Sequence, residues 1–330
     1  MILVGDIGGT GTRLGLYHPK DSPQEIQHST HFASKDVDHL EHAIEQFLEQ
    51  TGAHIEQAVL GVAGPVIDQS TTMTNLGWSF SSAGLRERFG LQSCTLINDM
   101  QAMAYAVPFL REDERVEAKA GNAADNGCVG VLALGTGLGT TLLVPTKEGY
   151  TAVASEGGHT SFAPQNEQQD ALLAFARERY GHVSHERVCS GSLGLPTLME
   201  FLLSSNPTPS WWTTCQTSGQ AIAPAVVAAA YDEVPPCALA RAALTMLASI
   251  LGSRAGNLAL TSMTTGGVYI GGGLAKRLAT LLAGKDFASD TFERAFVDKG
   301  RYEEVLEQIP ISIITHPNPG LLGAAAFASM

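Results

Sequence analysis

Two glycine-rich segments of the sequence could hold a phosphate chain. The first is Asp6-Ile-Gly-Gly-Thr10, followed by Gly11, and the second is Gly135-Thr-Gly-Leu-Gly139. Glycines let backbone N–H groups approach a polyphosphate closely, and a threonine hydroxyl adds a further hydrogen bond. An acid beside such a loop, here Asp6, can hold Mg²⁺ directly or through water, because this ion prefers oxygen ligands and keeps several waters. A simple hairpin turn is the alternative interpretation of either segment alone.

Neither segment matches the two best-known nucleotide-binding fingerprints. No Gly-Lys-Ser/Thr follows the first segment, which excludes a P-loop. That segment leads into another apolar run, Leu14 to Tyr17, and not into a helix. This excludes the dinucleotide-binding βαβ unit, and with it a nicotinamide dehydrogenase. Two strand–turn–strand hairpins roughly 130 residues apart instead favour a site in which both hairpins bind the same nucleotide, one from each side.

Acids, an amide and an imidazole stand beside other turns. Asn98 and Asp99 follow the apolar run 95–97, and ligands of α/β folds bind at the ends of such strands. Both residue types are also good helix N-caps, so the sequence leaves the two interpretations open. Glu156 and His159 flank a Gly-Gly pair, and Glu186 precedes Ser190-Gly191. These three side chains could hydrogen-bond sugar hydroxyls, with exposed loops as the alternative.

The elements that must position these residues alternate between strands and helices. Apolar runs predict strands at 2–5, 14–17, 57–62, 95–97, 128–134, 140–144, 267–270 and 311–314. Helical periodicity predicts helices at 36–50, 100–107, 166–180, 192–203, 235–260, 274–282 and 320–328. The polar segment 204–216, with Trp211 and Trp212, is expected to be a loop. This alternation predicts an α/β protein with two similar halves.

Composition narrows the class of protein further. The 330 residues carry 20 Lys and Arg against 33 Asp and Glu, a net charge of −13, which argues against nucleic acid as a partner. A hydrophobic content of 44% with 16% charged residues argues against disorder. Five widely spaced cysteines without a C-x-x-C pair indicate a reduced, cytoplasmic chain. No apolar run reaches 18 residues and no basic signal region opens the chain, so no membrane contact is expected.

Together these segments resemble the bacterial ATP-dependent glucokinase family, within the superfamily of sugar kinases, heat-shock chaperones and actin ATPases. The resemblance runs nearly end to end. The motifs that carry it are Gly5-Asp6-Ile-Gly-Gly-Thr10 with Arg13, Thr74-Asn75-x-x-Trp78, Ile97-Asn98-Asp99, Gly135-Thr-Gly-Leu-Gly139, Glu156-Gly-Gly-His159, Glu186-Arg-Val-x-Ser-Gly191, Gly267-Val-x-Ile-x-Gly-Gly273 and Asn318-Pro-Gly-Leu-Leu-Gly323.

The resemblance implies a fold and an activity. The fold would be two ribonuclease H-like (actin-like ATPase) α/β domains with a cleft between them: a small domain of 1–110 rejoined by the C-terminal helix 315–330, and a large domain of 111–314. Glucose would bind in the cleft and receive the γ-phosphoryl group of ATP on its 6-hydroxyl, the first step of glycolysis. A cytoplasmic homodimer that uses Mg²⁺ is the family expectation.

The resemblance also implies roles for individual residues. Asp99 would be the general base at the sugar 6-hydroxyl, and Asn98, Glu156, His159 and Glu186 would hold the other hydroxyls. Asp6 would organise Mg²⁺ through water. The phosphates would lie on two loops, one formed by Gly8, Gly9, Thr10 and Gly11 and the other by Gly135, Thr136 and Gly137. Adenine would lie near Gly271, Gly272 and Gly273.

Two departures from the family pattern matter. Gly11 stands where the family usually has Asn, which puts a side-chain contact near the phosphates in doubt. The segment after His159, 160–164, lacks the cysteines of the zinc motif found in related repressors, so no structural zinc is expected. A kinase for another hexose or an amino sugar is one alternative. A sugar-sensing regulator is a second, although the four residues before Gly5 leave no room for a DNA-binding helix-turn-helix.

Overall fold

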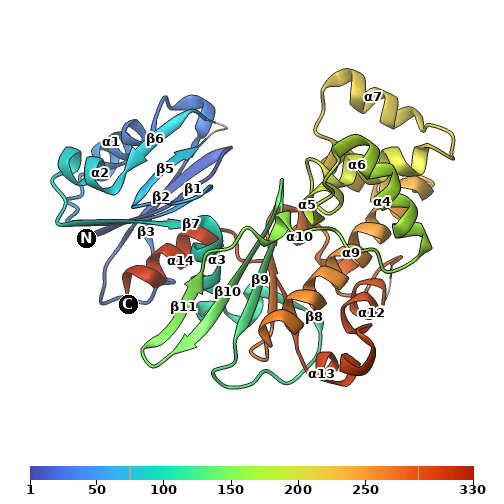
Figure 1. Cartoon of the computed structure of the whole chain (residues 1–330). Helices are drawn as coiled ribbons and strands as arrows, with labels where there is room; N and C mark the ends of the chain where they lie inside the picture. The colour runs from blue at the N-terminus through green and yellow to red at the C-terminus, as the bar shows by residue number, and fades with distance from the viewer. Residues whose placement is uncertain (74–75, 289) are drawn as a thin grey trace. The chain divides into compact units, whose positions relative to one another are not determined.

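The structure is a computed structural model that describes residues 1–73, 76–288 and 290–330 (Figure 1). The predicted motif pair Thr74-Asn75 therefore lies outside the described residues. The chain forms two compact units, the first made of Met1–Glu112, Thr141–Ala154 and His316–Met330, and the second of Asp113–Thr140 and Ser155–Thr315. Each unit combines β-strands with helices, which confirms the mixed α/β class.

The first unit is built on a five-stranded sheet with the order β3-β2-β1-β4-β7. Strands β1 to β3 are antiparallel, and β1, β4 and β7 are parallel. A two-stranded ribbon, β5 with β6, and the helix α2 (Ser82–Phe89) complete this part. The strands are β1 (Ile2–Ile7), β2 (Gly11–Tyr17), β3 (Gln27–Ala33), β4 (Gln57–Val62), β5 (Ser70–Met73), β6 (Trp78–Ser81) and β7 (Ser93–Asn98).

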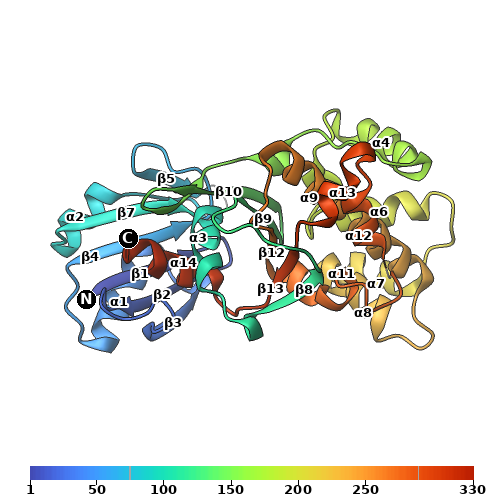
Figure 2. The same cartoon turned by 90° about the horizontal axis from the view of Figure 1, so that it is seen from below.

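Helices cover both faces of this sheet, which explains why β1 is a continuous apolar run. One face packs its alternate residues, such as Leu3 and Ile7, against α1 (Leu40–Thr51). On the other face, α3 (Asp99–Ala106) lies beside α14 (Pro319–Ala328), as Figures 1 and 2 show. The two helices touch through a glycine, because a Cβ built on Gly323 would overlap the carbonyl of Ala102. The short terminal helix is thereby fixed against the sheet that carries the first glycine loop.

One segment is divided differently from the sequence prediction. The hairpin of β10 (Leu138–Thr146) and β11 (Gly149–Val153) was expected within the large domain, but residues 141–154 belong to the first unit. Its end is held there by α3: Gln101 Nε2 donates to the carbonyl of Ala152 at 3.0 Å, and Ala152 N–H donates to Tyr105 Oη at 3.1 Å. The strand pattern of a hairpin does not reveal such tertiary contacts.

The second unit contains β8 (Arg115–Lys119), β9 (Val129–Leu134), β12 (Val268–Gly271) and β13 (Ile311–Ile314). These strands belong to a sheet with the order β11-β10-β9-β12-β13-β8, in which β12 is parallel to β9 and β13. Helix α9 (Ala238–Ser262) packs on α12 (Thr291–Val297) through Gly252 and Gly256, where a Cβ would overlap carbonyls of α12 (Figure 2). The other helices are α4 (Glu167–Tyr180), α5 (His185–Val188), α6 (Gly194–Leu203), α7 (Ser210–Ser218), α8 (Ile222–Tyr231), α10 (Gly273–Arg277), α11 (Ala279–Leu282) and α13 (Glu303–Glu307).

The structure corrects two other element predictions. The segment expected to be a polar loop contains helix α7, in which Trp212 is buried and meets the Trp211 ring edge-on at 5.7 Å. Burial of an aromatic ring overrides the weak helix propensity of a Ser- and Thr-rich segment. The helix predicted at 274–282 is interrupted at Leu278 into α10 and α11. Among the described helices, including the 25-residue α9, none is long and apolar enough to cross a membrane.

Candidate active site

The first glycine loop connects β1 to β2 in the first unit. Gly8 N–H donates to the carbonyl of Gly11 at 2.9 Å, which closes the turn. Ser34, which follows β3, forms two hydrogen bonds to this loop. Its N–H donates to Thr10 O at 3.2 Å and its hydroxyl donates to Gly8 O at 3.2 Å. The predicted hairpin with an exposed Thr10 is therefore present, and its backbone is held by a neighbouring segment.

Asp6, at the end of β1, lies against the first turn of α14. A Cβ built on Gly320 would lie 2.6 Å from Cγ of Asp6 and 2.7 and 2.9 Å from its two carboxylate oxygens, so only glycine fits there. Desolvation by the surrounding protein raises the pKa of Asp6, and the nearby Arg13 guanidinium opposes that rise. The N-terminal end of a helix favours negative charge. Asp6 is thus a strongly desolvated carboxylate held beside the glycine loop.

Gly11 has no side chain of its own, and a neighbour takes the space. A Cβ at Gly11 would overlap Nε2 of His31, a residue of β3. The departure from the family pattern at this position is therefore accompanied by an imidazole in the same place. The sequence alone gave no signal of it, because His31 is 20 residues away on another strand.

Asn98 caps helix α3, and Asp99 is its first residue. Asn98 Oδ1 accepts the N–H of Met100 at 3.0 Å, its amide nitrogen donates to Gly64 O at 3.0 Å, and Gln101 Oε1 accepts Asn98 N–H at 3.2 Å. These bonds bear out the cap interpretation of Asn98. Asp99 is partly exposed, and its Oδ1 accepts the same Met100 N–H at 2.8 Å. Negative charge is favoured at the N-terminal end of a helix.

The second glycine loop borders a cavity of about 570 Å³ within the second unit. Gly191 N–H donates to Gly135 O at 2.9 Å, and the N–H and hydroxyl of Ser192 both donate to Thr136 O, at 3.0 and 2.9 Å. The cavity volume of about 570 Å³ is typical of small-molecule sites. The residues lining the cavity are Gly135, Thr136, Gly191, Ser192, Ala221, Ile222, Ala223, Pro224, Gly273, Leu274 and Arg277.

This cavity gathers only part of the residues expected near adenine. Gly273, at the start of α10, lines it together with Leu274. Gly271 instead ends β12 opposite Ala133, and Gly272 adopts a φ of 97° where a Cβ would overlap the carbonyl of Leu134. Gly272 therefore lets the start of α10 pack closely on β9. Arg277 and the segment 221–224 also line the cavity, and no motif in the sequence pointed to them.

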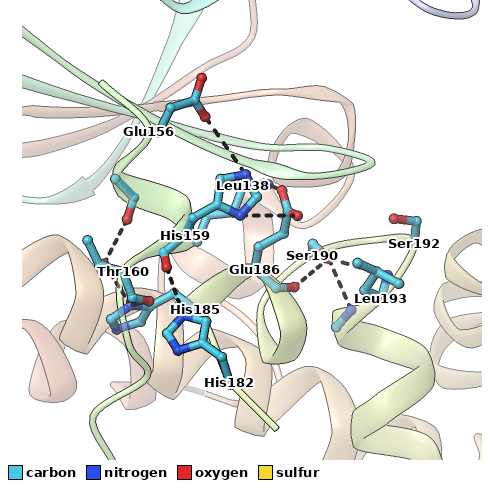
Figure 3. A network of polar contacts seen from close by, with 12 residues as sticks. Leu138, Glu156, His159, Thr160, His182, His185, Glu186, Ser190, Ser192 and Leu193 are labelled. Atoms are coloured by element: carbon cyan, nitrogen blue, oxygen red, sulfur yellow. Dashed lines mark hydrogen bonds and ion pairs between the residues drawn. The ribbon is translucent and has the colours of Figure 1, made fainter. Parts of the chain in front are cut away.

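A second group in this unit brings together the carboxylates and imidazole that the sequence singled out. Figure 3 shows the His159 ring between two acids: its Nε2 lies 3.8 Å from Glu156 Oε2 and its Nδ1 lies 3.9 Å from Glu186 Oε1. The side chain of Glu186 is 20% exposed, against 73% for that of Glu156. The other oxygen of Glu186 accepts Leu138 N–H at 3.0 Å. This carboxylate is thereby tied to the second glycine loop.

The sequence prediction missed two buried side chains near this group, Arg254 and His185. Arg254, from α9, donates through Nη2 to the carbonyl of Gly157 at 3.1 Å and so supports the turn before His159. His185 is buried, its Nδ1 lies 3.1 Å from Thr160 O, and its ring meets Phe162 edge-on. Burial and the charge of Arg254 lower the pKa of His185 from 6.5 to about 4, against the opposing hydrogen bond to Thr160. A lone Arg in an apolar helix and a His in a polar turn gave no sequence signal of this role.

This pKa predicts that stability falls in mild acid. As the pH falls from 7 to 5, His185 gains a proton in the unfolded chain but stays neutral in the native chain down to about pH 4. We expect this residue to cost the native state about 2 kcal/mol between pH 7 and pH 5. Urea unfolding at both pH values would show a smaller pH dependence in His185→Gln, with exposed His54→Gln as the control. Equal pH dependence in wild type and His185→Gln would contradict the prediction.

The mixed α/β fold, two glycine-rich hairpins and a group of two acids and an imidazole are together typical of a sugar kinase. Comparison with known proteins agrees. The glucokinase family model matches residues 3–330. The chain therefore belongs to the glucokinase family, and it is a sugar-kinase enzyme.

Individual relatives have the same character. A glucokinase from Psychromonas ingrahamii is 39% identical over 326 residues, which cover 98% of this chain and 96% of the relative. The crystal structure of a glucokinase from an Antarctic psychrotroph aligns with a TM-score of 0.82 at 32% identity, over 99% and 98% of the two chains. A ROK-family glucokinase from Streptomyces griseus, solved with glucose and AMPPNP, aligns with a TM-score of 0.64 at 21% identity over 98% of both chains and shares the fold.

Proposed function

We propose that this chain transfers the γ-phosphoryl group of ATP to the 6-hydroxyl of glucose, giving glucose 6-phosphate, the first intermediate of glycolysis. The observation that carries the proposal is the group formed by Glu156, His159 and Glu186, whose Glu186 carboxylate is bonded to the second glycine loop. Acids and an imidazole suit several sugar hydroxyls, and a site built on such bonds rejects sugars that leave its groups unpaired. Family membership supports the same substrate.

In this proposal Asp99 acts on the reacting hydroxyl. Its carboxylate orients the 6-hydroxyl and accepts its proton as the phosphoryl group transfers. Asp99 lies in the first turn of α3, where the helix dipole favours negative charge. Asn98 donates through Nδ2 to Gly64 O and accepts Met100 N–H through Oδ1, which holds the start of α3 beside Asp99. An amide nitrogen carries two N–H donors, and we propose that the second contacts a sugar hydroxyl.

The phosphates of ATP would lie on the loops that contain Gly8, Gly9 and Thr10, and Gly135, Thr136 and Gly137. Mg²⁺ would neutralise the phosphate charge, and Asp6 would organise it through water. The donor fits this ion because the Asp6 carboxylate is a hard oxygen donor. Mg²⁺ is usually bound with substrate phosphates and few protein ligands.

A panel of sugars in a coupled ADP-release assay tests the proposal. We expect release with glucose to exceed that with other hexoses and with amino sugars. Preference for another sugar would assign the chain to the kinase alternative. Sugar binding without ADP release from any sugar would support the regulator. We also propose a cytoplasmic homodimer, which light scattering coupled to gel filtration would test.

Gly137→Ala is expected to weaken sugar binding although position 137 lies in the phosphate loop. A Cβ there would lie 2.5 Å from Glu186 Oε2. The Glu186 carboxylate must therefore move away from the sugar hydroxyl that it is proposed to bind. Loss of one hydrogen bond to a charged group predicts a KM for glucose about 10-fold higher. Gly135→Ala, whose Cβ meets nothing closer than 4.0 Å, should leave that KM unchanged. Equal glucose KM values in Gly137→Ala and wild type would contradict the expectation that a side chain at position 137 weakens glucose binding by displacing Glu186.

A further inference from the structure

The imidazole of His31 occupies the place of a side chain at position 11. A Cβ built on Gly11 would overlap His31 Nε2, with Cε1 at 3.2 Å and Cδ2 at 3.3 Å. Gly11 is the first residue of β2 and directly follows the loop of residues 8–10. The tip of the imidazole ring therefore stands at the end of the first glycine loop, and it can stand there only because residue 11 is glycine.

His31 belongs to a row of polar side chains across the sheet. Asp6 of β1 pairs with Arg13 of β2, and Arg13 pairs with His31 of β3. Directly paired residues of antiparallel strands project to the same face of the sheet. The face that carries the proposed Mg²⁺ residue Asp6 thus also carries a guanidinium and an imidazole, two side chains that can donate to anionic oxygens.

The strand that carries His31 is fastened to the loop. Ser34, three residues after His31, donates from its backbone to Thr10 O and from its hydroxyl to Gly8 O, each at 3.2 Å. The end of the strand that carries His31 is therefore bonded to the loop before any ligand arrives. Such preorganisation reduces the cost of ordering a side chain on binding.

His31 is exposed, and its ring nitrogens have no hydrogen-bond or ion-pair partner within the described part of the chain. An apolar side chain would cover Gly11 equally well. An imidazole adds an N–H donor, which is suited to a ligand with acceptor oxygens. A phosphate chain on the adjacent loop is such a ligand.

We propose that His31 is a ligand of the phosphate chain of the nucleotide, and that its imidazole donates a hydrogen bond to a phosphate oxygen held by the loop of residues 8–10. The inference rests on the proposed function, which supplies the nucleotide. Hydrogen bonds to an ionised acceptor are about twice as strong as neutral ones. Gly11 is then the residue that leaves the imidazole its place.

Calorimetric titration with AMPPNP in the presence of Mg²⁺ tests the inference. We expect His31→Ala to weaken AMPPNP binding about 10-fold, and His31→Gln, which keeps an N–H donor, to recover part of it. His54→Ala, an exposed imidazole remote in sequence from the loop, is the matched control and should bind as wild type. Inhibition by adenosine, which has no phosphate, and the KM for glucose should not change in any of these variants.

A double-mutant cycle tests the geometry. Gly11→Ala displaces the imidazole and should also weaken AMPPNP binding about 10-fold, but it should add less than about two-fold in the His31→Ala background. Fully additive losses, or an AMPPNP affinity of His31→Ala within about two-fold of wild type, would overturn the inference. So would equal losses for AMPPNP and adenosine together with a lower unfolding temperature, because these indicate a merely structural role. A wild-type chain that binds no AMPPNP would instead overturn the proposed function.

Discussion

Asp99→Asn is expected to lower kcat by roughly 10²- to 10⁴-fold, the contribution usual for a general base. The amide keeps the size of the side chain and can still contact the sugar, but it cannot accept the proton of the 6-hydroxyl. Glucose affinity should therefore fall much less than turnover. ADP release measures kcat, and calorimetric titration with glucose measures affinity.

The control for this variant is Asp38→Asn, which removes a carboxylate that is 92% exposed in the same unit. It should leave kcat and the KM for glucose unchanged. Near-normal turnover in Asp99→Asn would remove Asp99 from the role of base. A parallel loss of glucose affinity and turnover would mean that Asp99 only binds the sugar.

Asp6→Asn is expected to lower kcat/KM for MgATP by roughly 10²- to 10³-fold, the usual cost of removing one group that stabilises charge in the transition state. The variant loses the charge that would hold Mg²⁺ beside the phosphates. A titration of activity against Mg²⁺ should show a higher Mg²⁺ requirement, whereas the KM for glucose should stay close to that of wild type.

Stability separates this effect from misfolding. Desolvation raises the pKa of Asp6, so its charged form costs the native state free energy above the ordinary pKa of an aspartate. The neutral amide removes that cost, and we expect the unfolding temperature of Asp6→Asn not to fall below that of wild type. A normal Mg²⁺ requirement in a folded Asp6→Asn protein would exclude the proposed role.

Much of the local structure could be predicted from the chain. The runs at 57–62 and 311–314 match β4 and β13 because a strand buried on both faces requires continuous apolar residues. The helices α4 and α14 begin within one residue of their predicted starts, since Asn166 and Pro319 are local signals. Where packing outweighs propensity, as for Trp212 in α7, the prediction of a loop at 204–216 was wrong.

The candidate site likewise contains residues that could be predicted from the sequence and residues that could not. Its glycine loops, Asp99 and the Glu156–His159 turn were visible because their residue types and spacing are local in the chain. Arg254 and Arg277 were not, because each is placed by a helix that packs from elsewhere. A single charged residue in a helix has the same local pattern whether it faces solvent, a carbonyl or a cavity.

The sequence by itself determined the fold class, the family resemblance and the residue types that could bind phosphate and sugar. Only the tertiary structure decided that Glu186 is tied to the second glycine loop, that Gly320 leaves room for the Asp6 carboxylate, and that His31 fills the space over Gly11. The physical reason is that a backbone N–H, or the space left by a missing Cβ, acquires its role only from the atom that lies opposite it. In each of these cases that atom belongs to a residue far away along the chain.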